Sequence, residues 1–121
     1  MAPPLLKLKR VYDEPAIEDG KRVLVDRLWP RGLAKKDAKL TDWIKDVAPS
    51  PELRKWFDHR PERFADFRES YRQELVSNPA VQTLLHFDDG PVTLVYGAKD
   101  PVHNHAVVLL EFLNALKARR S

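Results

Sequence analysis

Two short apolar runs, Val23–Val25 and Val92–Tyr96, stand out from the mixed pattern of the rest of the chain. Unbroken runs rich in β-branched residues are typical of strands that are covered on both faces, as in a parallel sheet. We therefore expect strands at Val23–Asp26 and Val92–Tyr96. The segment Lys7–Tyr12 alternates imperfectly between apolar and charged residues and predicts a further strand.

Helical spacing of apolar residues is clearest in the middle of the chain. Phe64, Phe67, Tyr71 and Leu75 recur at intervals that place them on one face of a predicted helix from about Glu62 to Val76. The other positions of this segment are mostly polar and are expected to face solvent.

Three further helix starts are marked by a capping side chain followed by proline. They are Ser50-Pro51, Asn78-Pro79 and Asp100-Pro101. A side-chain oxygen satisfies a free N–H group of the first turn, and a proline there has no N–H group to satisfy. The helices are predicted to run to about Phe57, to about Phe87 and, for the last one, from about Val102 to Ala118.

Three other segments are short or ambiguous. Ala34–Ala38 predicts a single helical turn, and Asp88-Asp89-Gly90-Pro91 predicts a break before the strand at Val92. Leu40–Val47 has apolar residues at helical spacing, whereas its length and flanks also allow an irregular strand. Both interpretations of Leu40–Val47 stay open.

Strands that alternate with helical segments predict an α/β fold with a small, mostly parallel sheet flanked by helices. At 121 residues the chain is long enough for one ordinary domain, and we expect residues 1–121 to form a single domain. Right-handed crossovers place the carboxyl ends of such strands at one edge, where ligands bind in open α/β sheets. The residues that follow Val25 and Tyr96 are therefore the first candidates for a functional site.

Composition narrows the classes of function. The chain has no cysteine, which excludes disulfides, thiolate nucleophiles and cysteine zinc sites. No apolar stretch approaches the roughly 18 residues that span a membrane, and we identify no signal peptide, so we expect a cytoplasmic protein. The net charge of +3 fits a mildly basic surface, and it also fits attraction to an anion or a nucleic acid.

The first candidate cluster follows the strand at Val23 and consists of Asp26, Arg27 and Arg31. An arginine fork binds phosphate or carboxylate through two parallel hydrogen bonds, so both arginines are candidate ligand-binding residues. Asp26 is a candidate catalytic base, or a group that orients one of the arginines. The alternative is a structural salt bridge at the end of the strand.

The second candidate cluster lies between Tyr96 and the last predicted helix. Lys99 and Asn104 are candidate ligand-binding residues. The predicted helix start offers free N–H groups and a partial positive charge to an anion, and Lys99 adds a full positive charge. His105 is the second candidate catalytic residue, since an imidazole can transfer protons near neutral pH. The alternative is that Asp100 is a simple cap and that the histidines are ordinary polar residues of the first turn.

Neither a metal nor a cofactor is expected. His103 and His105 stand two residues apart, so they would not share one face of a helix. Trp29, Trp43 and Trp56 lie close to basic residues, a pattern that fits stacking on nucleic-acid bases or, more commonly, filling of the core.

Four long segments carry a resemblance to a known family: VYDEP (11–15), DGKRVLVDRLWPRG (19–32), WIKDVAPSPELRKWF (43–57) and LVYGAKDPVHNHAVVL (94–109). Together they resemble the YeaO-like branch of domain-of-unknown-function family 488, over nearly the whole chain. The resemblance implies an α/β fold and a cytoplasmic bacterial or archaeal protein, and it implies no established biochemical activity.

The other branch of this family has Cys-His-Arg where the present chain has Asn104-His105-Ala106. Thiolate chemistry inferred for that branch therefore does not transfer, and only His105 keeps its chemical type.

Three hypotheses of function remain. The first is a small enzyme or ligand-binding domain for a phosphate- or nucleotide-like anion at the carboxyl ends of the strands. The second is a nucleic-acid-binding module, for which we expect weak, salt-sensitive binding at most. The third is an interaction domain without catalysis that forms a homodimer through its last helix, whose residues are apolar on most sides.

Overall fold

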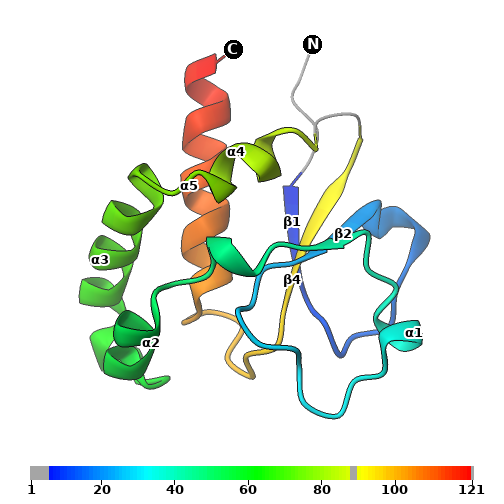
Figure 1. Ribbon diagram of the computed structural model, residues 1–121, viewed down its shortest axis with the longest axis horizontal. Helices are drawn as coiled ribbons and strands as arrows, with labels where there is room; N and C mark the ends of the chain where they lie inside the picture. The colour runs from blue at the N-terminus through cyan, green and yellow to red at the C-terminus, as the bar shows by residue number, and fades with distance from the viewer. Residues whose placement is uncertain (1–5, 88–89, 121) are drawn as a thin grey trace.

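The structure is a computed structural model that describes residues 6–87 and 90–120, and a parallel sheet lies at its centre (Figure 1). The strands are β1 (Leu6–Arg10), β2 (Lys21–Leu24), β3 (Asp42–Trp43) and β4 (Val92–Tyr96), in the spatial order β1-β4-β2-β3. Every pairing within the described residues is parallel. The predicted α/β fold with a small parallel sheet is confirmed.

The two strands that carry the candidate site pair with each other. β4 has the predicted bounds, and all of its residues are buried, as an unbroken apolar run requires. β2 begins earlier than predicted because Lys21 already pairs with Val92. The ladder extends beyond β2, since the Val25 N–H donates to the Val95 oxygen at 3.1 Å.

Helices cover the sheet and extend beyond it. They are α1 (Lys35–Ala38), α2 (Pro51–Phe57), α3 (Phe64–Val76), α4 (Ala80–Leu85) and α5 (His105–Arg120). Single 3-10 turns lie at Ile17–Asp19, Lys45–Val47 and Pro61–Arg63. The single helical turn and the helices expected to end near positions 57 and 76 are confirmed, whereas α4 stops short of position 87.

Two of the three cap-then-proline signals start a helix where predicted. The Ser50 hydroxyl accepts the Leu53 N–H at 3.2 Å, and Pro51 is the first residue of α2. The Asn78 side-chain oxygen accepts the N–H of Ala80, the first residue of α4, at 2.9 Å.

The third signal does not start a helix, and the prediction that the last helix begins near Val102 is wrong, because α5 begins at His105. Asp100 caps a separate turn, in which its Oδ1 accepts the Val102 N–H at 2.9 Å. Asn104 caps the helix itself, since its Oδ1 accepts the Val107 N–H at 3.1 Å. The local turn at Asp100 therefore delays the helix.

The segment Leu40–Val47 contains both of the structures that its pattern allows. Asp42–Trp43 is the short edge strand β3, and Lys45–Val47 is a 3-10 turn. Between them, the Ile44 N–H donates to the Leu24 oxygen at 2.9 Å and prolongs the contact with β2. The break predicted at positions 88–91 falls partly on residues 88 and 89, which lie outside the described residues.

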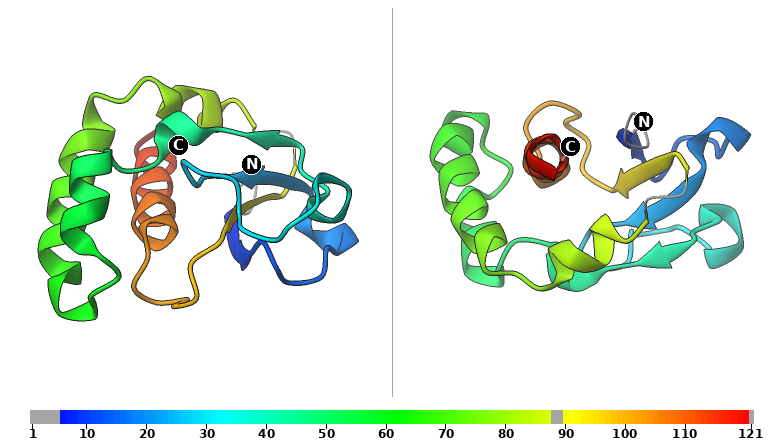
Figure 2. Two further views of the ribbon diagram at one scale, coloured as in Figure 1. Left: turned by 60° about the horizontal axis from the view of Figure 1, so that its bottom comes forward. Right: turned by 90° about the horizontal axis from the view of Figure 1, so that it is seen from above.

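The main core lies on one face of the sheet. α5 packs against β1 and β4, and α3 packs against α5, so that α5 is seen end-on between α3 and the sheet in the right-hand view of Figure 2. The apolar stripe predicted for α3 is buried here, together with four apolar residues of α5: Ala106, Val108, Leu109 and Leu113. Leu110, Phe112 and Leu116 are half-buried and pack against the same core.

The opposite face of the sheet carries a smaller core beneath α1 and the loops that flank it. Its buried residues are Val11, Leu24, Ala38 and Val95. Trp29 and Trp43 pack against this core, with their rings edge to face at a centroid distance of 5.5 Å. These two tryptophans thus fill a core.

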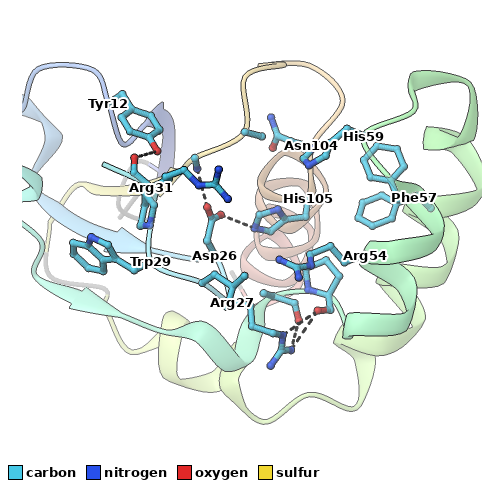
Figure 3. Close-up of a pocket in the computed structure, with 17 residues that line it drawn as sticks. Tyr12, Asp26, Arg27, Trp29, Arg31, Arg54, Phe57, His59, Asn104 and His105 are labelled. Carbon is cyan, nitrogen blue, oxygen red and sulfur yellow. Dashed lines mark hydrogen bonds and ion pairs between the residues drawn. The ribbon is translucent and has the colours of Figure 1, made fainter. Parts of the chain in front are cut away.

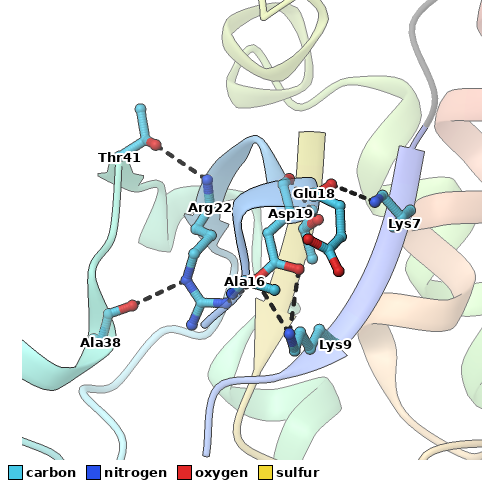
Figure 4. Close-up of polar contacts among 9 residues, drawn as sticks. Lys7, Lys9, Ala16, Glu18, Asp19, Arg22, Ala38 and Thr41 are labelled. Atoms are coloured by element: carbon cyan, nitrogen blue, oxygen red, sulfur yellow. Dashed lines mark hydrogen bonds and ion pairs between the residues drawn. The ribbon is translucent and has the colours of Figure 1, made fainter. Parts of the chain in front are cut away.

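A buried ionic network ties the strands together on this face (Figure 4). The Asp19 carboxylate accepts hydrogen bonds from Arg22 at 2.7 Å and from Lys9 at 3.2 Å. Arg22 Nε also donates to the Ala38 oxygen at 3.0 Å, and the Thr93 hydroxyl donates to the Asp19 backbone oxygen at 2.7 Å. The network therefore joins β1, β2, β4 and α1.

None of the helices in the described residues combines the length and the apolar character that crossing a membrane requires.

Candidate functional site

The carboxyl ends of β2 and β4 lie side by side, as predicted, and a pocket of about 370 Å³ lies beside them (Figure 3). This volume is within the range of about 300–1,000 Å³ that is typical of small-molecule sites. The polar side chains that line it belong to Tyr12, Asp26, Arg27, Arg31, Arg54, His59, Asn104 and His105. Its apolar lining includes Leu28, Trp29, Pro30, Phe57 and Phe67.

Asp26 is fixed by contacts from two directions. Its Oδ2 accepts the Gly97 N–H at 2.8 Å, which joins the loops that follow β2 and β4. Its backbone oxygen accepts the indole N–H of Trp43 at 2.7 Å. A Cβ atom at Gly97 would lie 3.0 Å from Oδ2, so glycine lets the two loops approach this closely.

His105, the first residue of α5, lies beside Asp26. Its Nε2 is 3.2 Å from Asp26 Oδ1 and 3.1 Å from the Val25 backbone oxygen. A carbonyl oxygen only accepts hydrogen bonds, so the partners of Nε2 assign a proton to that nitrogen. Asp26 and Arg27 were both expected within reach of the segment Lys99–His105, and this is confirmed for Asp26 by its contact with His105. Arg27 lines the same pocket as His105 but bonds to Ala48 and Pro49.

Tyr71 packs against His105, and the two rings meet at an angle of 67° with centroids 6.3 Å apart. The Tyr71 hydroxyl donates to the Val47 oxygen at 2.6 Å. Burial, together with the nearby negative charges of Glu74 and Asp26, raises the pKa of Tyr71 well above 10.0. Tyr71 therefore stays neutral and acts as a fixed support.

Arg27 has a structural role in this arrangement. Its Nη2 donates to the backbone oxygens of Ala48 and Pro49 at 3.2 and 3.3 Å, and its Nε donates to Pro49 at 3.4 Å. The guanidinium group thus holds the segment that leads into α2 against the loop after β2. No salt bridge joins Arg27 to Asp26 among the described residues.

Arg31 and Arg54 extend toward the middle of the pocket from opposite walls (Figure 3). Arg31 belongs to the loop after β2, which is anchored where the Tyr12 hydroxyl donates to the Arg31 backbone oxygen at 2.8 Å. Arg54 projects from α2. Within residues 6–87 and 90–120, neither guanidinium group forms an ion pair.

Asn104 lines the pocket, but both polar atoms of its buried side-chain amide form hydrogen bonds with backbone groups. Nδ2 donates to the Asp100 oxygen at 2.8 Å, while Oδ1 caps α5. Lys99 is exposed and is not part of the pocket lining. The structure thus brings Asp26, Arg27, Arg31, Asn104 and His105 together, and Lys99 lies outside.

Arg54, Tyr12 and His59 are pocket residues that the sequence analysis did not select. Arg54 directly follows the buried Leu53 on α2, and the sequence carries no local signal that this helix faces the strand ends. His59 has a positive φ of 53°, which a sequence pattern does not reveal.

His103 makes a separate pair with Asp100, in which Nδ1 and Oδ2 are 2.9 Å apart. Backbone hydrogen bonds from Val102 and His103, supported by the His103 side chain, lower the pKa of Asp100 to about 2. The two histidines of this segment therefore have different carboxylate partners. No cluster of three or more metal-binding side chains occurs in the described part of the chain.

Comparison with known proteins identifies the relatives of this chain. Residues 5–121 match the family DUF488-N3i, described as the "Inactive DUF488-N3 subclade". The chain is 44% identical to the uncharacterized protein YeaO of Escherichia coli (strain K12) over 113 residues, 92% of this chain and 98% of that protein. It is 43% identical to the uncharacterized protein Rv3073c of Mycobacterium tuberculosis over 110 residues, 90% of this chain and 93% of that protein.

No solved structure matches the chain. The family match extends over nearly all of the chain and includes every residue that lines the pocket. The resemblance to the YeaO-like branch is confirmed, and the chain belongs to the DUF488-N3i family as a YeaO-like member.

Proposed function

We propose that the pocket beside the ends of β2 and β4 binds a small anion of the phosphate- or nucleotide-like kind. The observation that carries this proposal is the pair of arginines, Arg31 and Arg54, that enter one pocket from opposite walls without an ion-pair partner among the described residues. An anion between them would gain charge-assisted hydrogen bonds from both sides.

The other charged groups of the lining support the same proposal. Within residues 6–87 and 90–120, the lining contains three arginines and one carboxylate, Asp26, which is held by Gly97 and His105. Arg27 is braced by backbone oxygens, so its positive charge is fixed beside the pocket. The excess of positive charge in a partly closed space favours anions.

The apolar part of the lining bears on the kind of anion. Leu28 is 59% exposed, and it lies in the same pocket wall as Trp29 and Pro30. An inorganic ion would leave this surface uncovered, whereas a ligand with a ring beside its anionic group would cover it. This combination supports a nucleotide-like ligand.

The family description favours a protein that binds this anion without catalysing a reaction. The matching family is described as an inactive subclade. In this chain both polar atoms of Asn104 are committed to the backbone, so this side chain offers no reactive group to a ligand. A cytoplasmic location, expected from the family resemblance, is part of the same proposal.

The test compares ligand binding by the wild type and by Arg31→Gln and Arg54→Gln. Calorimetry with inorganic phosphate, sulfate and nucleoside monophosphates should show binding by the wild type. Because a hydrogen bond to a charged group contributes about 1.5–3 kcal/mol, each variant should bind roughly 10- to 100-fold more weakly. Arg119→Gln is the matched control, since Arg119 is exposed on α5 outside the pocket.

All titrations are made at one ionic strength, with chloride replacing the ligand in the reference, so that general salt effects cancel. Equal affinities for the wild type and both pocket variants, or an equal loss in the Arg119 control, would show that the pocket is not the site. No binding of any of these anions would remove the proposal.

A further inference from the structure

We infer that His105 takes up one proton, at its Nδ1 atom, when an anion enters the pocket. The inference rests on the proposed function and adds the way in which the site is regulated: binding is linked to pH through one residue. It follows from how the two ring nitrogens of His105 are placed.

One ring nitrogen is already occupied. Nε2 lies 3.1 Å from the Val25 oxygen and 3.2 Å from Asp26 Oδ1, and both of these atoms are hydrogen-bond acceptors. A bare nitrogen lone pair at this place would face two centres of negative charge, so Nε2 carries a proton in both the neutral and the charged ring.

The other ring nitrogen is available. Nδ1 has no hydrogen-bond partner among the described residues, and it is not one of the fully buried polar atoms that lack a partner, so it keeps contact with solvent. His105 itself lines the pocket. Protonation of His105 therefore forms a new N–H bond at Nδ1, with a proton from the solvent, and leaves the contacts of Nε2 in place.

Charged and titratable groups reach the surroundings of the ring from several elements. They are Asp26, Arg27 and Arg31 after β2, Arg54 and His59 on and after α2, Tyr71 on α3, and the Asp100–His103 pair in the loop before α5. Tyr71 stays neutral, and Asp100 is paired with His103. Among the described residues, Asp26 is the one carboxylate in the pocket lining.

This carboxylate provides the physical reason for the coupling. Asp26 Oδ1 is buried and accepts no hydrogen bond of good geometry, while His105 is its nearest ionisable partner at 3.2 Å. An anion that enters the pocket comes close to the Asp26 charge and is repelled by it. A proton on His105 converts the neighbour of Asp26 into a cation and offsets this repulsion, so anion binding and protonation favour each other.

The sign of the pH dependence follows from this coupling. Anion affinity should rise as the pH falls, because anion binding and protonation of His105 favour each other. One linked proton limits the slope to about tenfold per pH unit.

Sulfate is the suitable probe, because its own charge stays constant across the range in which imidazole titrates. Its affinity is measured by calorimetry from about pH 5.5 to 8.5, at one ionic strength and in two buffers with different ionisation enthalpies. The wild type should bind sulfate at least tenfold more tightly at the acidic end. The heat of binding near neutral pH should differ between the buffers, because a proton is taken from them.

Two substitutions separate His105 from a histidine outside the pocket. His105→Gln keeps a donor for Val25 and Asp26 but cannot titrate, so its sulfate affinity should lose most of its pH dependence. His86→Asn is the matched control: His86 is exposed at the end of α4 outside the pocket, and the variant should keep the pH dependence of the wild type.

Nitrogen-15 NMR of the labelled histidines tests the geometry without a ligand, and it should show His105 protonated at Nε2 in its neutral form. A neutral ring that is protonated at Nδ1 would overturn the inference, and so would an unchanged pH dependence in His105→Gln. Sulfate binding that is equally strong at all pH values would overturn the coupling while leaving the anion site intact. Absence of sulfate binding at every pH would remove the anion site and the coupling together.

Discussion

Asn104 and His105 are neighbours in the chain, but their side chains serve different parts of the molecule. Asn104 joins the loop after β4 to α5, because its amide bonds both the Asp100 oxygen and the Val107 N–H. His105 faces the end of β2 and contacts Val25 and Asp26. The first supports the position of the second, since the helix start determines where the imidazole lies.

Asn104→Ala should lower the free energy of unfolding by about 2 kcal/mol. The change removes a helix cap, which contributes about 0.5–2 kcal/mol, and a buried hydrogen bond to Asp100. Asn104→Ser should lose less, because its hydroxyl can still cap the Val107 N–H. Urea denaturation of the three proteins measures this order, and equal losses in the two variants would show that the cap contributes nothing.

Individual site residues were predictable from the sequence where the end of a strand determines the position of the side chain. Asp26 directly follows Val25, whose N–H still bonds to the neighbouring strand β4. The strand alone therefore places the Asp26 side chain at the carboxyl edge of the sheet. Arg54 reaches the same pocket only through the packing of α2, and no local pattern encodes that packing. Lys99 illustrates the opposite case, since it follows a strand but lies in an exposed part of the loop.

At the scale of elements, the link between β1 and β2 depends on a short 3-10 turn and on the carboxylate at its end. Asp19 accepts hydrogen bonds from Lys9 on β1 and Arg22 on β2. Gly20 follows with a φ of 65°, and a Cβ atom there would lie only 2.2 Å from the Pro91 oxygen. Glycine is therefore the residue that lets this turn lie against the chain entering β4.

Asp19→Asn should destabilise the protein at neutral pH and remove part of its sensitivity to acid. Burial alone would raise the pKa of Asp19, but hydrogen bonds from the Ala16 N–H, Arg22 and Lys9 outweigh it and hold the pKa below 3.8. The stability that the carboxylate contributes is therefore present above about pH 4 and is lost as the pH falls through the lowered pKa.

The measurement is urea denaturation at pH 7 and at about pH 3. The variant should be about 1–3 kcal/mol less stable than the wild type at pH 7, and the difference should shrink in acid. Asp37→Asn is the control, because Asp37 is exposed on α1 and should leave the pH profile unchanged. A constant difference between Asp19→Asn and the wild type at both pH values would contradict the assigned role.

Element types were more predictable from the sequence than element boundaries. The buried strand β4 and the α3 stripe follow from apolar periodicity, which persists over many residues. The start of α5 depends instead on a competition between two capping side chains, Asp100 and Asn104, that lie four residues apart. Both capping geometries satisfy local N–H groups, so the sequence pattern alone does not decide between them.

At the scale of the whole molecule, most of the apolar residues of α5 pack against other parts of the same chain. Its residues pack between α3 and the sheet. The exposed residues of this helix in the described part of the chain are Glu111, Asn114, Ala115, Ala118 and Arg119. A second pocket, between α3 and α5, is lined by Val76, which is 76% exposed, and by Phe112 among other residues. A homodimer through α5 stays a prediction, and light scattering at several concentrations measures it directly.

Binding to nucleic acid should be weak and should depend only moderately on salt. Trp29 and Trp43 pack against the smaller core and against each other, and Arg63 lies over the ring of Trp56, so the three rings do not form a continuous platform for successive bases. The exposed lysines of α1 lie beside the exposed Asp37, which reduces their combined field. A net charge of +3 therefore allows only a few phosphate contacts at a time.

Fluorescence anisotropy with a labelled single strand and a labelled duplex, at several salt concentrations, tests this expectation. About three phosphate contacts would give a slope of log affinity against log salt near −3, and affinity at physiological salt should be no stronger than the common non-specific range of about 10⁻⁴–10⁻⁶ M. A 5′-phosphorylated strand compared with an unphosphorylated one shows whether a terminal phosphate enters the pocket, because Arg54→Gln would then weaken only the phosphorylated strand. A slope near −5 or steeper would correspond to about six contacts and would make nucleic acid, rather than a small anion, the main partner.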